Sequence, residues 1–227
     1  MKPKLFLWAA VVLLMAIGAK SRAGEITVLA GVSQFYKPAD GVYWNANQQN
    51  DFQANPLAAG LRWDSERSGA WSWAVQYTYF GRAKMDAYAV TTDAPAQGGY
   101  IPNSGGQCVG ACAGLAQWHM SSEAQSIAVL ATRHWGPWSL EAGVNFYETR
   151  TRGYVDSYQT VASHFTYAET TWLDYGPVVG AAYRSGPWSI RLQIWRMEGK
   201  GDSGDGYKAP TMFSPDRQWT LLGGYTF

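Results

Sequence analysis

Long stretches of this chain alternate between apolar and polar residues, so that every second side chain has the same character. The clearest stretch begins at Trp71, where the odd positions to Met85 are mostly apolar or aromatic and the even positions are mostly polar. The same alternation follows Pro137 and Pro187. Because successive side chains of a β-strand point to opposite faces, this period of two predicts strands with one apolar face.

A repeated segment marks the start of several strands, in the form Gly69-Ala70-Trp71, Gly136-Pro137-Trp138 and Gly186-Pro187-Trp188. Glycine and proline in such pairs favour tight turns. Four much longer connections lie between these hairpins, at residues 37–53, 90–117, 153–169 and 199–216. The pattern predicts an all-β fold of eight antiparallel up-and-down strands, at about residues 25–36, 54–64, 71–88, 118–134, 138–151, 170–184, 188–198 and 217–227.

The unequal lengths of the connections indicate a membrane rather than an aqueous environment. Outer-membrane barrels have short periplasmic turns at one end and long extracellular loops at the other, and their strands need about 9–11 residues to cross the bilayer. Tryptophans gather beside the short turns, as an interfacial aromatic girdle requires: Trp63, Trp71, Trp73, Trp135, Trp138 and Trp188. An unpaired backbone N–H or C=O group is costly in hydrocarbon. The first strand must therefore pair with the eighth in a closed transmembrane β-barrel.

Composition and charge support this interpretation. Charged residues make up 15% of the chain, against about 25% in ordinary soluble domains, and aromatic residues also make up 15%, with 12 tryptophans. The formal net charge of +1 argues against a nucleic-acid-binding protein, which usually carries a basic stripe. A soluble lipocalin-like barrel is the remaining alternative, and it predicts an apolar interior.

The N-terminus has the features of a secretory signal peptide. Lys2 and Lys4 precede an uncharged run from Leu5 to Ala19, and small residues follow at the expected cleavage position after Ala23. We therefore expect a signal peptide at residues 1–23 and a barrel domain at residues 24–227. Removing the signal takes away four bases and no acid, so the exported chain has a net charge of −3.

The last strand carries the features of a known family. It ends in Tyr225-Thr226-Phe227, and with the signal peptide and eight alternating strands it resembles the small outer-membrane β-barrels of the OmpA/OmpX type. In that family the aromatic pair at the positions of Tyr225 and Phe227 is the signal for the barrel assembly machinery. The resemblance implies the outer membrane of a Gram-negative bacterium, with membrane lipid and lipopolysaccharide as partners.

An eight-stranded barrel is only wide enough inside to be filled by its own side chains. The polar strand faces, taken as inward, place these residues in the lumen: Arg62, Gln76, Arg82, Lys84, Glu141, Asn145, Asp174, Arg184, Arg191 and Gln193. Counted from the short turns, Arg62, Glu141 and Arg191 lie at similar heights. We therefore expect an ionic cluster with Glu141 between two arginines, serving as a structural plug or, alternatively, as a gate for small ions.

Two cysteines, Cys108 and Cys112, lie four residues apart in the longest connection. In an exported chain they indicate a disulfide that staples the loop. A metal site is not expected, because two thiols without a third nearby ligand do not complete a tetrahedral shell. No cofactor is indicated.

Candidate catalytic residues are few. His119 and Ser121 lie two apart, on one face of a strand, with Glu123 nearby. This pair resembles the pattern of lipid A deacylases, which are also eight-stranded outer-membrane barrels, but the acid expected about a dozen residues after the serine falls near Arg133. We therefore expect a protein without enzymatic activity.

The sequence thus favours a barrel with a filled lumen that acts at the cell surface, in adhesion or envelope protection. We expect its outer loops to contact an extracellular ligand or a host surface. A lipid A acyl hydrolase is the alternative from another class. A narrow channel for small solutes is the third hypothesis.

Overall fold

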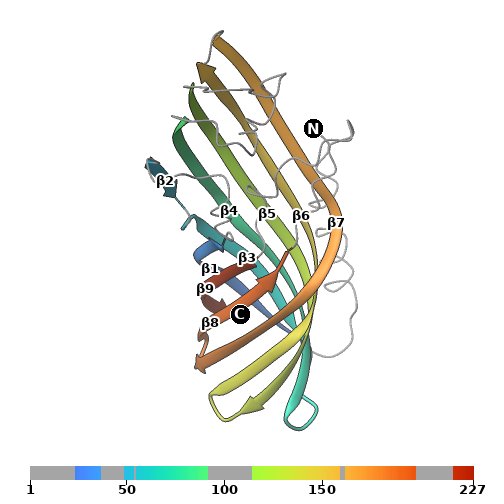
Figure 1. The fold of residues 1–227 in the computed structure, drawn as a ribbon. Helices are drawn as coiled ribbons and strands as arrows, with labels where there is room; N and C mark the ends of the chain where they lie inside the picture. The colour runs from blue at the N-terminus through green and yellow to red at the C-terminus, as the bar shows by residue number, and fades with distance from the viewer. Residues whose placement is uncertain (1–23, 37–48, 54, 92–113, 159–161, 198–216) are drawn as a thin grey trace.

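A computed structural model describes residues 24–36, 49–53, 55–91, 114–158, 162–197 and 217–227 of the chain (Figure 1). It consists of strands β1 (Glu25–Tyr36), β2 (Gln49–Gln53), β3 (Leu57–Asp64), β4 (Trp71–Thr91), β5 (Gly114–Trp135), β6 (Trp138–Tyr158), β7 (Ala162–Ser185), β8 (Trp188–Arg196) and β9 (Arg217–Thr226). No helix in this part of the chain is long and apolar enough to cross a membrane. The expected signal peptide, residues 1–23, lies outside the described residues.

The strands form one closed antiparallel barrel, which confirms the predicted fold class. Each wall strand pairs with its neighbours in chain order, and β9 pairs with β1 from Thr226 opposite Thr27 to Arg217 opposite Tyr36. The short strand β2 lies against the same edge of β4 as β3 does, at a different level. Eight strands therefore make the wall, with β2 and β3 sharing one position in it.

The pairing is staggered around the barrel. A path of directly opposed residues leaves β1 at Glu25 and returns to it at Phe35, ten residues further along, by way of Asp64, Ala74, Leu130, Gly143, Val178, Trp195 and Gln218. Such a stagger tilts barrel strands by about 35–45° from the axis. An eight-stranded barrel of this kind encloses a space that side chains can fill.

The predicted short turns are confirmed at one end of the barrel. Gly136–Pro137 joins β5 to β6 and Gly186–Pro187 joins β7 to β8, while a longer turn that includes Gly69 joins β3 to β4. The three glycines have φ values of 63°, 59° and 58° in chain order, a region that residues with a Cβ enter at a cost. The repeated glycine in the sequence therefore corresponds to a repeated backbone requirement.

Four neighbouring strands are much longer than the others. Strands β4 to β7 have 21 to 24 residues, whereas β1, β3, β8 and β9 have 8 to 12. Figure 1 shows β4 to β7 continuing together as a sheet beyond the ends of the shorter strands. We call this part, residues 83–91, 114–122, 150–158 and 162–170, the sheet extension.

The sheet extension corrects one expectation. Residues 153–169 were expected to form a long connection, but β6 and β7 pair through nearly all of them, down to Tyr158 opposite Ala162. The segment has few apolar residues in alternation, so its sequence resembles that of a loop. It is nevertheless a β-hairpin, in which residues 153–158 of β6 pair with residues 162–167 of β7.

A β-bulge corrects the expected orientation of two basic residues. The β4–β5 register shifts between Tyr79 and Arg82, at Gly81, which has a φ of 80°. The bulge reverses the alternation, so that Ala83 is buried and both Arg82 and Lys84 are exposed on the outer face. Their placement in the lumen was wrong, because a period of two holds only while each residue has one partner across the ladder.

Candidate functional site

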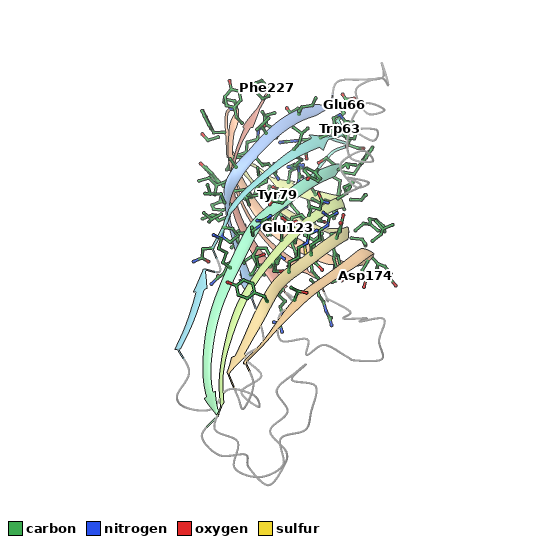
Figure 2. All side chains as sticks on the ribbon, turned by 90° about the horizontal axis from the view of Figure 1, so that it is seen from above. Trp63, Glu66, Tyr79, Glu123, Asp174 and Phe227 are labelled. Atoms are coloured by element: carbon green, nitrogen blue, oxygen red, sulfur yellow. The ribbon has the colours of Figure 1, made fainter. Side chains whose placement is uncertain are left out.

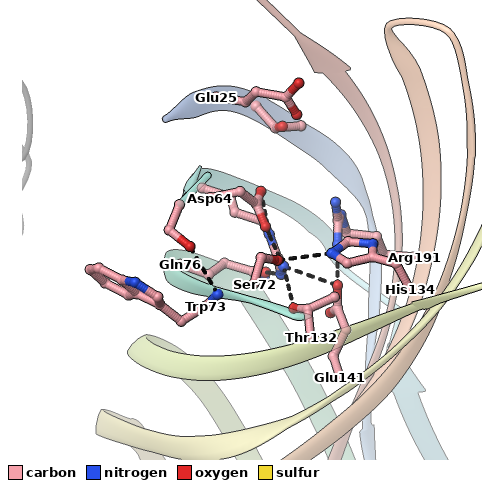
Figure 3. A network of polar contacts seen from close by, with 12 residues as sticks. Glu25, Asp64, Ser72, Trp73, Gln76, Thr132, His134, Glu141 and Arg191 are labelled. Carbon is pink, nitrogen blue, oxygen red and sulfur yellow. Dashed lines mark hydrogen bonds and ion pairs between the residues drawn. The ribbon is translucent and has the colours of Figure 1, made fainter. Parts of the chain in front are cut away.

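The interior near the short-turn end contains an ionic cluster of buried side chains (Figure 3). Arg62 of β3, Glu141 of β6 and Arg191 of β8 come together there, as the counting from the turns suggested. Nη2 of Arg62 lies 3.1 Å from Oε1 of Glu141, and Nη1 of Arg191 donates to the same oxygen. No two of these three strands are neighbours in the wall, so the contacts of this one carboxylate cross the lumen.

The cluster contains a second carboxylate that the sequence reasoning did not single out. Asp64 accepts hydrogen bonds from Arg62, at 2.8 Å from Nε and 2.7 Å from Nη2. Two arginines and two carboxylates make the cluster neutral, which offsets the cost of burying each charge. The sequence did contain an indication of this contact, because Arg62 and Asp64 lie two residues apart on one face of the strand.

Neutral side chains complete the network. Nε2 of Gln193 donates to Oε2 of Glu141 at 2.9 Å, so both oxygens of this carboxylate are hydrogen-bonded. Gln76 and Gln193 also exchange hydrogen bonds through their amides, at 2.9 and 3.1 Å, and Nη2 of Arg62 donates to Oγ1 of Thr132 at 3.1 Å. Together these contacts join side chains of β3, β4, β5, β6 and β8 across the lumen at this level.

Further from the short turns the lumen is filled by apolar and aromatic side chains. Phe80 and Trp195 are both fully buried and meet edge to face, with ring centroids 5.2 Å apart. Nε1 of Trp195 donates to Oγ1 of Thr220 at 3.0 Å. The remaining members of this layer are Phe35, Ala74, Ala83, Ala124, Ala128, Leu130, Tyr147, Val178 and Met197. The lumen is therefore closed by two layers, one ionic and one apolar.

A cavity of about 450 Å³ opens at the short-turn end, and Arg62, Asp64 and Arg191 of the ionic cluster form part of its lining. Oγ of Ser72 lies 2.9 Å from Nε2 of His134 at its wall. Glu25 of β1 and Arg184 of β7 form an ion pair across its rim. Arg184 thus lies at the mouth rather than within the ionic cluster, although the sequence placed it on the inward face.

The outer face of the barrel wall is apolar over most of its height. Large apolar side chains there are exposed, including these: Val28, Val32, Val129, Leu140, Val144, Phe146, Val179, Ile190, Leu192 and Leu221. A soluble protein rarely exposes a continuous apolar surface of this extent. An apolar outside around a polar, hydrogen-bonded inside is the arrangement that a transmembrane barrel needs.

Aromatic side chains mark the short-turn end of this surface. Trp71, Trp73, Trp135, Trp138 and Trp188 are exposed, and Trp63 is half-buried against Trp73 with ring centroids 4.7 Å apart. The C-terminal aromatics lie at the same end, where Tyr225 contacts both Trp188 and Phe227. Figure 2 shows Trp63 and Phe227 at this end, with Tyr79 and Glu123 further along the wall. The predicted girdle residues thus share one level.

The candidate catalytic residues lie beyond the apolar wall. Ser121 and Glu123 are half-buried on β5; Oγ of Ser121 donates to the backbone oxygen of Arg152 at 3.4 Å, and Glu123 pairs with Arg82. His119 is opposite Asp86 in the β4–β5 register, but its side chain is outside the described part. Cys108 and Cys112 also lie outside the described residues. Among the described residues, no group of three or more His, Cys, Asp or Glu could hold a metal ion.

Comparison with known proteins finds similarity in structure alone. No family model and no curated protein matches the sequence. Solved structures similar to this chain include Ail, the attachment invasion locus protein of Yersinia pestis, in complex with the heparin analogue sucrose octasulfate (9% identity, TM-score 0.45, covering 91% of this chain and 100% of that chain). They also include the outer membrane protein OprG of Pseudomonas aeruginosa (10% identity, TM-score 0.44, 91% and 97%) and Neisserial surface protein A (12% identity, TM-score 0.34, 90% and 98%).

Proposed function

We propose that this chain is an integral outer-membrane β-barrel with a filled lumen that acts at the surface of a Gram-negative cell, in adhesion or envelope protection. The observation that carries this proposal is the distribution of polarity. The outer wall is apolar, and the interior is closed by the Arg62–Glu141–Arg191 cluster and by the layer around Phe80 and Trp195. A barrel of this kind functions through its ends rather than by transport through its lumen.

The sheet extension supports a role at the surface. Strands β4 to β7 continue past the apolar wall at the end opposite the short turns, which in such barrels is the extracellular end. Four paired strands outside the membrane form a surface that is available to an extracellular partner. We expect the partner to be an extracellular ligand or a host surface.

The membrane placement is tested by extraction and by gel migration. The protein should need detergent to stay monodisperse, and the unheated sample should migrate differently from the heated one. A detergent-free, monodisperse preparation would instead favour a soluble lipocalin-like barrel. For the surface role, cells expressing the chain should bind host-cell or matrix surfaces more than cells expressing a variant that lacks residues 150–170.

A lipid A acyl hydrolase is a second candidate. It is favoured by the position of Ser121, which lies on the outer face of β5 just beyond the apolar wall, near the level of outer-leaflet acyl esters. Mass analysis of lipid A from expressing cells separates the two candidates, with Ser121→Ala as the control. A loss of acyl chains that depends on Ser121 would establish the hydrolase and contradict a purely binding role.

A further inference from the structure

The outer face of β4, β5 and β6 changes character sharply along its height. We define a row as the residues that oppose one another on these three strands. Upward from the apolar wall, the rows are Val75–Val129–Val144, Tyr77–Ile127–Phe146, Tyr79–Gln125–Glu148, Arg82–Glu123–Arg150 and Lys84–Ser121–Arg152. Over four rows the surface passes from valines through tyrosines to arginines.

The height of this change matches a lipid boundary. From Trp71 to Tyr79 a strand rises about 20 Å along the barrel axis, taking about 3.3 Å for each residue and a tilt of about 40°. The apolar band of outer-membrane barrels is about 25 Å tall. If the tryptophans mark the inner interface, the charged rows lie at the headgroups of the outer leaflet.

The charged rows are net positive. Arg82, Lys84 and Arg152 are exposed, and Arg150 is partly exposed. The two carboxylates beside them are already paired: Glu123 accepts from Arg82 at 3.2 Å, and Glu148 accepts from Nε of Arg150 at 2.7 Å. Four cations against two carboxylates leave a charge of +2 at this level of the wall.

A cavity of about 580 Å³ lies in the outer wall at this boundary. Its apolar side is formed by Ala59, Leu61, Tyr77 and Tyr79, and its polar side by Glu123, Gln125, Glu148 and Arg150. We call it the boundary notch. Of the four cations in the charged rows, Arg150 lines the notch, while Arg82, Lys84 and Arg152 lie beside and above its polar side.

Hydrogen bonds hold the polar side of the notch in place. The Tyr77 hydroxyl donates to Oε1 of Gln125 at 3.1 Å, and Nε2 of Gln125 donates to Oε2 of Glu148 at 2.9 Å. Glu148 is buried, so its pairing with Arg150 fixes the guanidinium at the rim. The Gly81 bulge turns Arg82 and Lys84 outward at the same level, and a second bulge lies between Tyr147 and Thr149. Bulges often re-aim side chains next to functional sites.

We propose that the boundary notch binds an anionic lipid of the outer leaflet, with a phosphorylated headgroup on Arg82, Lys84, Arg150 and Arg152 and an acyl chain along Leu61, Tyr77 and Tyr79. Charge complementarity selects a phosphorylated headgroup over a zwitterionic one. The proposal rests on the outer-membrane placement proposed above and adds a defined lipid site to it.

Native mass spectrometry of the detergent-solubilised full chain tests this site, with bis-phosphorylated lipid A as the probe. Each cation near an anionic headgroup contributes about 1 kcal/mol, which corresponds to about fivefold in affinity. The double variant Arg82→Gln, Lys84→Gln should therefore bind the probe about 25-fold more weakly. The matched control is Arg133→Gln, which removes an exposed arginine that lies over Trp71 and Trp135 at the opposite end; its affinity should equal that of the wild type.

The outcomes separate this site from the membrane placement. Heat-modifiable migration of all three proteins shows whether each is a folded membrane barrel, and its absence in the wild type would contradict the placement itself. If all three fold and bind the probe equally, the notch is not the site. Equal binding of dephosphorylated lipid A to the wild type would likewise overturn the proposal, because the arginines would then not recognise the headgroup.

Discussion

Nη2 of Arg62 lies 3.1 Å from Oε1 of Glu141, and neither side chain has any accessible surface. The two residues come from β3 and β6, which are not neighbours in the barrel wall, so their contact crosses the lumen. Glu141 also accepts from Arg191 and Gln193. One carboxylate therefore ties together three separate parts of the wall.

Replacing that carboxylate should be costly. Glu141→Ala leaves two buried arginines and a single carboxylate, Asp64, which pairs with Arg62. Breaking a buried ion pair in this way costs about 3–5 kcal/mol. Urea unfolding in detergent micelles measures the free energy of unfolding. The control is Glu123→Ala, which removes a partly exposed carboxylate paired with Arg82 and should cost at most about 1 kcal/mol. Equal losses in the two variants would show that the cluster does not stabilise the barrel.

The closed lumen predicts how the protein behaves in planar bilayers. The wild type should form no large, stable open channels, because an ionic layer and an apolar layer both block the path. Removing both large side chains of the second layer, in Phe80→Ala with Trp195→Ala, should still leave conductance low while the ionic cluster is intact. Adding Glu141→Ala to that double variant should raise the frequency of openings. Large steady channels in the wild type would contradict the plug and favour the narrow-channel hypothesis.

Alanine substitutions at Gly81 and Gly69 test whether the bulge requires a glycine, with Gly69 as the control. Both have positive φ, but a Cβ at Gly81 would lie 2.3 Å from the backbone oxygen of Leu57, whereas nothing lies within 4 Å of one at Gly69. Gly69→Ala should cost about 1–2 kcal/mol, the penalty of the left-handed backbone alone. Gly81→Ala should cost clearly more, measured as the fraction of barrel that folds into micelles. A cost at Gly81 no larger than at Gly69 would show that β3 and β4 can separate freely there.

The apolar wall predicts that the cost of an outward-facing arginine to stability depends on its depth in the membrane. Val144→Arg puts a charge near the middle of the band and should destabilise the barrel by about 2–4 kcal/mol in a bilayer. Tyr154→Arg is an equally exposed change in the sheet extension and should cost about 0–1 kcal/mol. Unfolding in liposomes compares them. In a soluble barrel the arginine at position 144 would meet water instead, so the two variants would be equally stable.

Much of the wall follows from the local pattern of residues. Alternation after Trp71, Pro137 and Pro187 predicted which side chains face outward, and the glycines at 69, 136 and 186 marked the turns. These features are local, because a strand's two faces and a turn's backbone geometry depend on a few adjacent residues. The approach of Arg62, Glu141 and Arg191 was also predictable, since each lies a short count of residues from a turn at the same end.

The reversal at Gly81 was not visible in the alternation. The bulge adds one residue to β4, and beyond it Arg82 and Lys84 face outward instead of into the lumen. Only the pairing of β4 with β5 shows where this extra residue lies. The sheet extension was missed for a related reason. Residues 153–169 have few apolar residues in alternation, and only the folded sheet shows their pairing, from Gly153 opposite Tyr167 to Tyr158 opposite Ala162.

The sequence by itself determined an eight-stranded barrel with an apolar outer wall, because strand period, turn residues and aromatic placement are properties of short segments. The tertiary structure alone decided the stagger of the strands, the apolar layer around Trp195 and the notch beside Glu148. Each of these depends on which residues stand opposite one another across the sheet or the lumen. That register comes from the closure of the whole barrel, and no single segment encodes it.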